Sequence, residues 1–320
     1  MTWKEERCGS ARELFDRLTA DTMADQGTGD TYRGEACAAW QQTNSRFDRY
    51  YDEYQTKHIE ADGRIPLPRS RRTRASIPAW DGSQVVGATA YLLERIVLGE
   101  FMIEAGRHLP DIERMNIAPA FESGLSLGAL QVAQHFGAAT RLVDWTASPW
   151  IAAFFACVTL PDQDGVIWSF NRSAFEAKSQ EQWKRIRVPC IYDSRRGMRE
   201  GPGYPYCLCF EDDTPHPRDF DFELGYGRPR NWFTLVSNSV GFSRQREQHG
   251  LFTLAGELHQ DHRHSILRMN DNYDSLACRK LVVAAAAKPG VMKLLHSLGI
   301  SSVSLGLPYR QPDLRPESMT

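Results

Sequence analysis

The segment HFGAATRLVDWTASPWIAAFFAC, residues 135–157, places the tightest constraint on how this chain can fold. Its second half, PWIAAFFAC, is apolar on every side, which is typical of a helix buried in a protein core. Its first half reads as a strand and carries Arg141 and Asp144 toward the same interior. Ser148 followed by Pro149 is a strong helix start, because serine caps a helix and proline loses no needed N–H at the first position. The sequence therefore predicts a strand that runs directly into a buried helix.

The polar residues of this segment have two interpretations. In a structural interpretation, Arg141 pairs with Asp144, Thr146 is a turn residue and Ser148 is only a cap, since buried charges are normally paired. In a ligand-binding interpretation, the helix start offers free N–H groups and a positive dipole end, which suit a phosphate or a ribose hydroxyl. Arg141 and Ser148 would then complete an anion site.

Composition narrows the class of protein. The chain has 320 residues, 42% of them hydrophobic and 24% charged, as in a soluble globular protein. A formal net charge of -2 argues against a generally basic nucleic-acid binder. The N-terminus has no apolar signal-peptide region, the apolar runs are too short to cross a membrane, and the seven scattered cysteines form no CxxC pair. We therefore expect a cytoplasmic protein with reduced thiols and no membrane contact.

Hydrophobic periodicity and turn residues predict helices before strands. Helices are expected at 10–25, 36–60, 84–107 (one or two), 122–136 and 288–300, and loops at 63–78 and 211–231. Strands are expected at 31–34, 165–171, 185–193, 206–210, 249–254, 265–270 and 279–287. Helices first and strands later favour an α+β fold over a parallel α/β sheet.

Three blocks of the sequence resemble the FRG-domain family, which is named for an [FY]-R-G motif. The first block is Tyr32-Arg33-Gly34. The second is LQVAQHFGAATRLVDWTASPWIAAFFA followed by GVIW, which looks like the long central motif of the family. The third is RQREQHGLF (244–252), which is similar to the family pattern R-x-x-x-Q-x-G-x-F.

The order of these blocks is remotely similar to that of ADP-ribosyltransferases of the Arg–Ser–Glu type. The resemblance implies an α+β fold with a mixed or antiparallel sheet core of ADP-ribosyltransferase-like type and an N-terminal helical part. It also implies one FRG/ADP-ribosyltransferase-like domain over residues 1–320, with a helical insertion at about 36–130. Fold analogy does not fix function, so the site has to be argued from its residues.

The same resemblance implies which residues form the site. Arg33 would have a catalytic role together with Glu247 or Gln248 of the third block, which on a strand would face opposite sides. An amide orients a hydroxyl but cannot neutralise charge, which leaves Asp144 as an alternative carboxylate. Tyr32, Trp145 and Phe252 are available as an aromatic wall for nicotinamide. The implied NAD-binding residues are Tyr32, Arg33, Gly34, His135, Arg141, Asp144, Trp145, Thr146 and Ser148.

We therefore expect an NAD-dependent ADP-ribosyltransferase, with NAD as its substrate, no metal, and a protein or a nucleic acid as the acceptor. Such an enzyme would act as a bacterial toxin or an anti-phage effector, and it would then have an antitoxin or another neutralising partner. Two alternatives stay open: a non-catalytic FRG module that binds a nucleotide or a partner, and an NAD glycohydrolase.

Other polar clusters are weaker candidates. The pattern His259-x-x-His262-x-His264 lies in an expected loop with no cysteine nearby, so no metal is expected. Arginine-rich runs at 69–74 and 192–199 could contact RNA or DNA phosphate, but charge runs are most often solvated faces.

Overall fold

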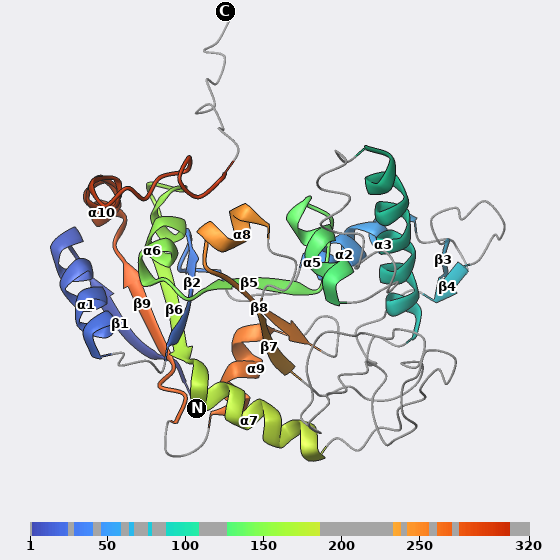
Figure 1. Ribbon diagram of the computed structural model, residues 1–320, viewed down its shortest axis with the longest axis horizontal. Helices are drawn as coiled ribbons and strands as arrows, with labels where there is room; N and C mark the ends of the chain where they lie inside the picture. The colour runs from blue at the N-terminus through green and yellow to red at the C-terminus, as the bar shows by residue number, and fades with distance from the viewer. Residues whose placement is uncertain are drawn as a thin grey trace, which may run out of the picture.

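The computed structural model describes residues 2–24, 29–40, 46–58, 64–66, 76–78, 88–108, 127–185, 233–237, 242–255, 261–270 and 275–307. The fold is α+β and is built on a seven-stranded mixed sheet with the order β1-β9-β6-β2-β5-β8-β7 (Figure 1). The strands are β1 (Lys4–Cys8), β2 (Asp30–Glu35), β5 (Leu142–Thr146), β6 (Gly165–Asn171), β7 (Phe233–Ser237), β8 (Gly250–Ala255) and β9 (Arg279–Val283). A separate pair is formed by β3 (Arg64–Pro66) and β4 (Ser76–Pro78).

Helices cover both faces of the sheet. They are α1 (Ala11–Ala24), α2 (Arg46–His58), α3 (Ala88–His108), α5 (Leu127–His135), α6 (Pro149–Cys157), α7 (Arg172–Arg185), α8 (Ser243–Glu247), α9 (His262–Met269) and α10 (Lys288–Ser297). Figure 1 shows α1, α6 and α10 on one side of the sheet, with α7 and α9 on the other. Among the residues described, none of the helices combines the length and the apolarity needed to cross a bilayer.

Side chains that alternate along the strands build two cores, one on each face. On β6, Ile167 joins a core with α1, α6 and α10, whereas Val166 and Trp168 join a core with α7 and α9. This alternation follows from the two-residue period of a strand. It explains why GVIWSFN is almost entirely buried although it lies in a mixed sheet.

The sheet is split next to its central strand. β2 pairs with β6 at six residue pairs, but with β5 at only one, Tyr32 with Thr146. β5 is otherwise paired with β8, and Figure 1 shows β5 running across the direction of β2 and β6. The two halves of the sheet, β1-β9-β6-β2 and β5-β8-β7, therefore meet at a single point.

Much of the element prediction is confirmed. The strand that runs into a buried helix is β5 followed by α6, and Ser148 caps α6 by accepting a hydrogen bond from the N–H of Ile151. The helices predicted at 10–25, 84–107, 122–136 and 288–300 are α1, α3, α5 and α10, and the strands predicted at 31–34, 165–171 and 249–254 are β2, β6 and β8.

Several predicted elements are wrong or shorter. The strand predicted at 265–270 is part of α9, which starts at the cap residue Asp261 and buries one side against the sheet. The predicted loop at 63–78 contains β3 and β4, and of the helix expected at 36–60 the structure shows α2, whereas the described residues 36–40 are not helical. The sequence does not predict β1, because four of its five residues, KEERC, are charged and show no clear alternation of polar and apolar side chains. Three predicted segments lie outside the described residues, apart from the last residue of α7: the strands at 185–193 and 206–210 and the loop at 211–231. The prediction of a single domain stays a prediction.

Two close contacts fix β2 against its neighbours. Lys288 is buried, and its Nζ donates to the carbonyl oxygens of Ala36 at 2.8 Å, Leu160 at 2.9 Å and Thr159 at 3.2 Å. Gly34 lies directly under α6, where a Cβ atom would collide with the carbonyl oxygen of Ala152. The glycine of the YRG block is thus required by packing.

We predict that Gly34→Ala destabilises the protein by about 3 kcal/mol or more, because backbone atoms of α6 would have to move. Gly99→Ala is the control, since Gly99 lies in α3 with open space around it. Alanine there should stabilise the helix by up to about 1 kcal/mol. Chemical denaturation of the two variants measures both effects, and an unchanged unfolding free energy for Gly34→Ala would contradict this packing.

Candidate functional site

Arg33 bridges the split between β2 and β5. Beyond the Tyr32–Thr146 pair, no further residues of the two strands are paired. Instead, the guanidinium of Arg33 reaches across, and its Nη1 donates to the carbonyl oxygen of Asp144 at 2.6 Å. A side chain thus makes a bond that a backbone N–H makes in a continuous ladder. It also brings the YRG block and the central block of the sequence together.

Glu35, on the same face of β2 as Arg33, holds the Arg33 side chain in this position. One carboxylate oxygen of Glu35 accepts a hydrogen bond from Nε of Arg33 at 2.9 Å, and the other accepts from Nε1 of Trp168 at 3.0 Å. Nη1 of Arg263 lies 3.5 Å from the second oxygen, and its guanidinium stacks 4.4 Å above the Trp168 ring. Because the Glu35 side chain is only 3% exposed, removing its partners would leave a buried charge.

Arg33 keeps hydrogen-bonding capacity for a ligand. A guanidinium has five N–H donors, and within the described part of the chain Arg33 uses one on Glu35 and one on Asp144. Its side chain is 24% exposed. The position of the cation is therefore fixed, while part of it still faces outward.

Asp144, whose backbone carbonyl oxygen binds Arg33, carries an oriented and exposed carboxylate on the other face of the sheet, which is the face of Tyr32. Its Oδ2 accepts a hydrogen bond from Nε2 of Gln134 at 3.0 Å, and the side-chain oxygen Oε1 of Gln134 in turn accepts from the Thr140 hydroxyl. The pairing of Arg141 with Asp144 predicted from sequence is wrong. Residues three apart along an extended chain point to opposite sides, and the Arg141 side chain instead forms a fully buried ion pair with Glu94 of α3.

The hydroxyls of the central block are used within the fold. Thr146 Oγ1 donates to the carbonyl oxygen of Gln248 at 2.7 Å and accepts from the N–H of Ser148 at 3.1 Å. Ser148 Oγ caps α6. The structural interpretation therefore accounts for Thr146 and Ser148, and the ion pair with Glu94 accounts for Arg141.

The aromatic residues proposed as a nicotinamide wall lie in the interior. Trp145 is buried, packs against Phe170, and donates from Nε1 to the Thr253 hydroxyl at 2.9 Å. Phe252 is also buried. Neither ring offers an open face to a ligand.

The strand predicted for Glu247 and Gln248 is wrong. Ser243–Glu247 forms the short helix α8, Gln248 lies in the turn after it, and β8 begins only at Gly250. The side-to-side alternation expected for these two residues therefore does not apply. Gln248 Nε2 donates to the carbonyl oxygen of Leu305 at 2.8 Å, while Glu247 is exposed. The Gln248 amide thus fastens this turn to the C-terminal part of the described chain.

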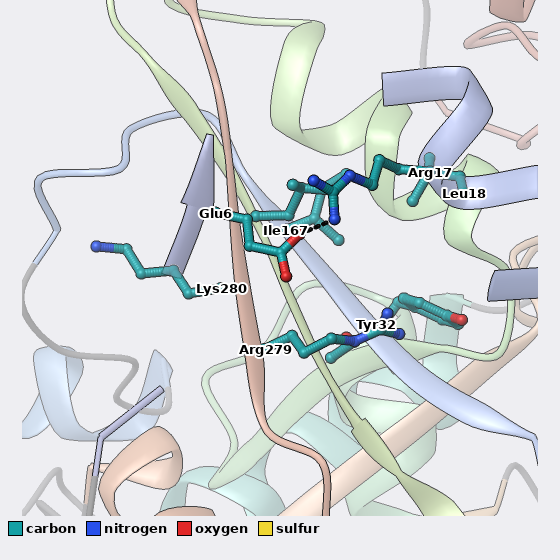
Figure 2. Close-up of a pocket in the computed structure, with 9 residues that line it drawn as sticks. Glu6, Arg17, Leu18, Tyr32, Ile167, Arg279 and Lys280 are labelled. Atoms are coloured by element: carbon teal, nitrogen blue, oxygen red, sulfur yellow. Dashed lines mark hydrogen bonds and ion pairs between the residues drawn. The ribbon is translucent and has the colours of Figure 1, made fainter. Parts of the chain in front are cut away.

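Tyr32 and His135 point away from the Arg33 guanidinium. Tyr32 lines a small pocket between α1 and the strands, together with Arg17 and Arg279 (Figure 2). Arg17 is paired there with Glu6, so this pocket has little unpaired charge. His135 stacks on Phe242 at 4.0 Å between ring centroids; burial, and then Arg244, lower the pKa of its imidazole.

His262 is a buried histidine that the sequence suggested only as part of a weak metal pattern. It is the first residue of α9, and its Nδ1 lies 2.7 Å from the Thr253 hydroxyl. Burial, and then the charge of Arg33, lower the pKa of His262 to about 3. Within the described residues no three His, Cys, Asp or Glu side chains gather as metal ligands would, and His259 lies outside them.

We predict that His262 makes the fold acid-sensitive. Its pKa is depressed from about 6.5 in the unfolded chain, so the stability it contributes is present above pH 6.5 and is lost as the pH falls toward 3. At pH 4.5 the loss should be roughly 2–3 kcal/mol relative to pH 7.5. Denaturation at both pH values should show a shallower loss for His262→Asn than for wild type. His264→Asn, in the same helix but exposed, should match wild type; equal losses in all three proteins would refute the prediction.

Comparison with known proteins identifies one region. Residues 30–165 match the family model of the FRG domain. This range contains Arg33, Glu35 and Asp144, but not the third block, Thr253 or His262. No curated protein and no solved structure matches the chain.

Proposed function

We propose that the FRG domain of this chain binds NAD at the split between β2 and β5 and transfers its ADP-ribose unit to an acceptor. The observation that supports this most is the placement of Arg33 and Asp144. Arg33 is a fixed cation with spare donors that binds the backbone carbonyl oxygen of Asp144 where β2 and β5 stop pairing, and the exposed carboxylate of Asp144 is oriented by Gln134.

The chemistry of the transfer assigns a role to each of these groups. The guanidinium of Arg33 would bind the pyrophosphate, since its planar donors match phosphate oxygens. The bond between ribose C1′ and the nicotinamide nitrogen breaks, and nicotinamide leaves with the electron pair. The nucleophile of the acceptor then bonds to C1′ and loses its proton to solvent. Asp144 would stabilise the positive charge that develops on the ribose.

Asp144 fits this role better than the residues of the third block. The Gln248 amide is bonded to Leu305 and cannot neutralise charge, and Glu247 lies outside the split on α8. Asp144 instead lies on β5 at the split itself, where its backbone carbonyl oxygen accepts from Arg33, and its carboxylate is exposed. The third block then supports the site through the hydrogen bond between Thr146 and the carbonyl oxygen of Gln248.

Two other functions use the same site. An NAD glycohydrolase differs only in letting water attack C1′, and it would need no acceptor. A non-catalytic module that binds NAD or another nucleotide is favoured by the absence of a carboxylate at Gln248. The proposal also includes a role as a toxin or an anti-phage effector, a macromolecular acceptor, a neutralising partner and a cytoplasmic location.

We predict that Arg33→Met weakens NAD binding at least about tenfold, because hydrogen bonds to a charged phosphate are lost. Arg279→Met is a matched control: Arg279 also lies on a strand of the sheet, is partly buried and pairs with a carboxylate, that of Asp30. Both variants lose an ion pair, but only the first loses the proposed ligand contact. Isothermal titration calorimetry with NAD, at a temperature where both are folded, separates them. Equal affinities would exclude Arg33 from the site.

We predict that Asp144→Asn keeps NAD binding within a few-fold but lowers nicotinamide release about 100-fold or more, as expected for a group that acts mainly in the transition state. Asp162→Asn, in an exposed turn, is the control. In the assay, each variant is incubated with labelled NAD and a cell lysate, and the nicotinamide that is released is measured.

The distribution of label decides between the functions. Label in protein or RNA supports transfer, and free ADP-ribose with nicotinamide alone supports the glycohydrolase. Binding without turnover by wild type would favour the non-catalytic module. Wild type that neither binds nor consumes NAD would contradict the proposal altogether.

A further inference from the structure

The hydrogen-bond chain through Thr253 determines which ring nitrogen of His262 carries the proton. Trp145 Nε1 can only donate, so the Thr253 hydroxyl oxygen accepts from it at 2.9 Å. The hydroxyl hydrogen then needs an acceptor, and in the described chain the only one that it reaches is Nδ1 of His262, at 2.7 Å. Nδ1 is therefore the unprotonated nitrogen, and Nε2 carries the proton.

The Nε2–H of His262 has no partner in the described part of the chain. Only 2% of the residue is exposed, and a buried donor without a partner is costly. The fold does seal some polar atoms away from solvent without a partner, such as Oγ1 of Thr31, but Nε2 is not one of them. This edge of the ring therefore still borders accessible space.

His262 lies beside the Arg33 cluster. The next residue, Arg263, contacts the carboxylate of Glu35, which in turn binds Arg33. Thr253 lies on β8 and is paired with Val143 of β5. β5 is the strand that faces β2 across the split. Arg33 is also close enough for its charge to lower the pKa of the imidazole, so the ring stays neutral at physiological pH.

We propose that His262 is a ligand-binding residue of the site, whose neutral Nε2–H donates a hydrogen bond to an oxygen of the bound dinucleotide next to Arg33. This inference rests on the proposed function and adds a contact from α9, outside the range that matches the FRG family model. A neutral donor beside a cation suits a phosphate oxygen or a carboxamide oxygen, because either oxygen can accept from both groups.

Two substitutions divide the ring's two functions between them. The amide of His262→Asn can occupy the Nδ1 position and still accept from Thr253, but it has no donor at the position of Nε2. The amide of His262→Gln can place a donor at the Nε2 position, but it leaves the Thr253 hydroxyl without its acceptor. We therefore expect a crossed result: the Asn variant is the more stable, and the Gln variant binds NAD better.

The experiment measures the melting temperature of each variant and its NAD affinity by calorimetry. His262→Asn should weaken NAD binding about 10- to 100-fold, and His262→Gln should restore it to within a few-fold of wild type. Thr253→Val gives a second measurement if the Gln variant does not fold. It removes the hydroxyl and lowers the melting temperature but keeps the imidazole, and the ligand oxygen itself then selects the tautomer that carries its proton on Nε2, so NAD binding should fall less than in His262→Asn.

The outcomes separate this inference from the proposed function. If wild type binds NAD, Arg33→Met does not, and His262→Asn binds as wild type, the inference is overturned while the proposed function stands. If affinity falls only in step with melting temperature across the three variants, His262 has a structural role and the inference is also overturned. If wild type does not bind NAD, both fail.

Discussion

The candidate site depends on the hydrogen bonds and the ion pair made by the buried carboxylate of Glu35. This carboxylate accepts hydrogen bonds from Arg33 and Trp168 and pairs with Arg263, so it ties β2, β6 and α9 together. Charge in the interior is tolerated only when it is paired and hydrogen-bonded. Here that requirement fixes Arg33, which has N–H donors to spare, at the point where β2 and β5 stop pairing.

The YRG block divides its work between the two faces of β2. Gly34 lies on the α6 face, where it allows a close approach to the helix, and Tyr32 belongs to the core on that face. Arg33 and Glu35 lie on the opposite face and form the ion cluster with Arg263. Because a strand alternates, one short motif supplies both a packing surface and a candidate binding residue.

Sequence reasoning found the elements with strong local signals. The start of α6 is given by Ser148 and Pro149, and the burial of α6 by its uniform apolar face. It failed at Arg141 because the partner Glu94 lies 47 positions away, and at α9 it overlooked a local signal, the capping residue Asp261 directly before the helix.

Of the residues in the proposed site, the sequence points to Arg33 and Asp144 but not to Glu35 or Arg263, and it suggests His262 only as part of a metal pattern. A signal for Glu35 was present, since it lies two residues after Arg33 and therefore on the same face. No comparable signal linked α9 to β2, because that contact arises only from the order of the strands.

A crystal structure of the protein with NAD, or with ADP-ribose if NAD is consumed, tests the proposed site most directly. We expect the pyrophosphate within hydrogen-bonding distance of the Arg33 guanidinium, the ribose beside the carboxylate of Asp144, and a ligand oxygen at Nε2 of His262. A ligand bound elsewhere, for example in the pocket lined by Arg17 and Arg279, would contradict the site at the split between β2 and β5.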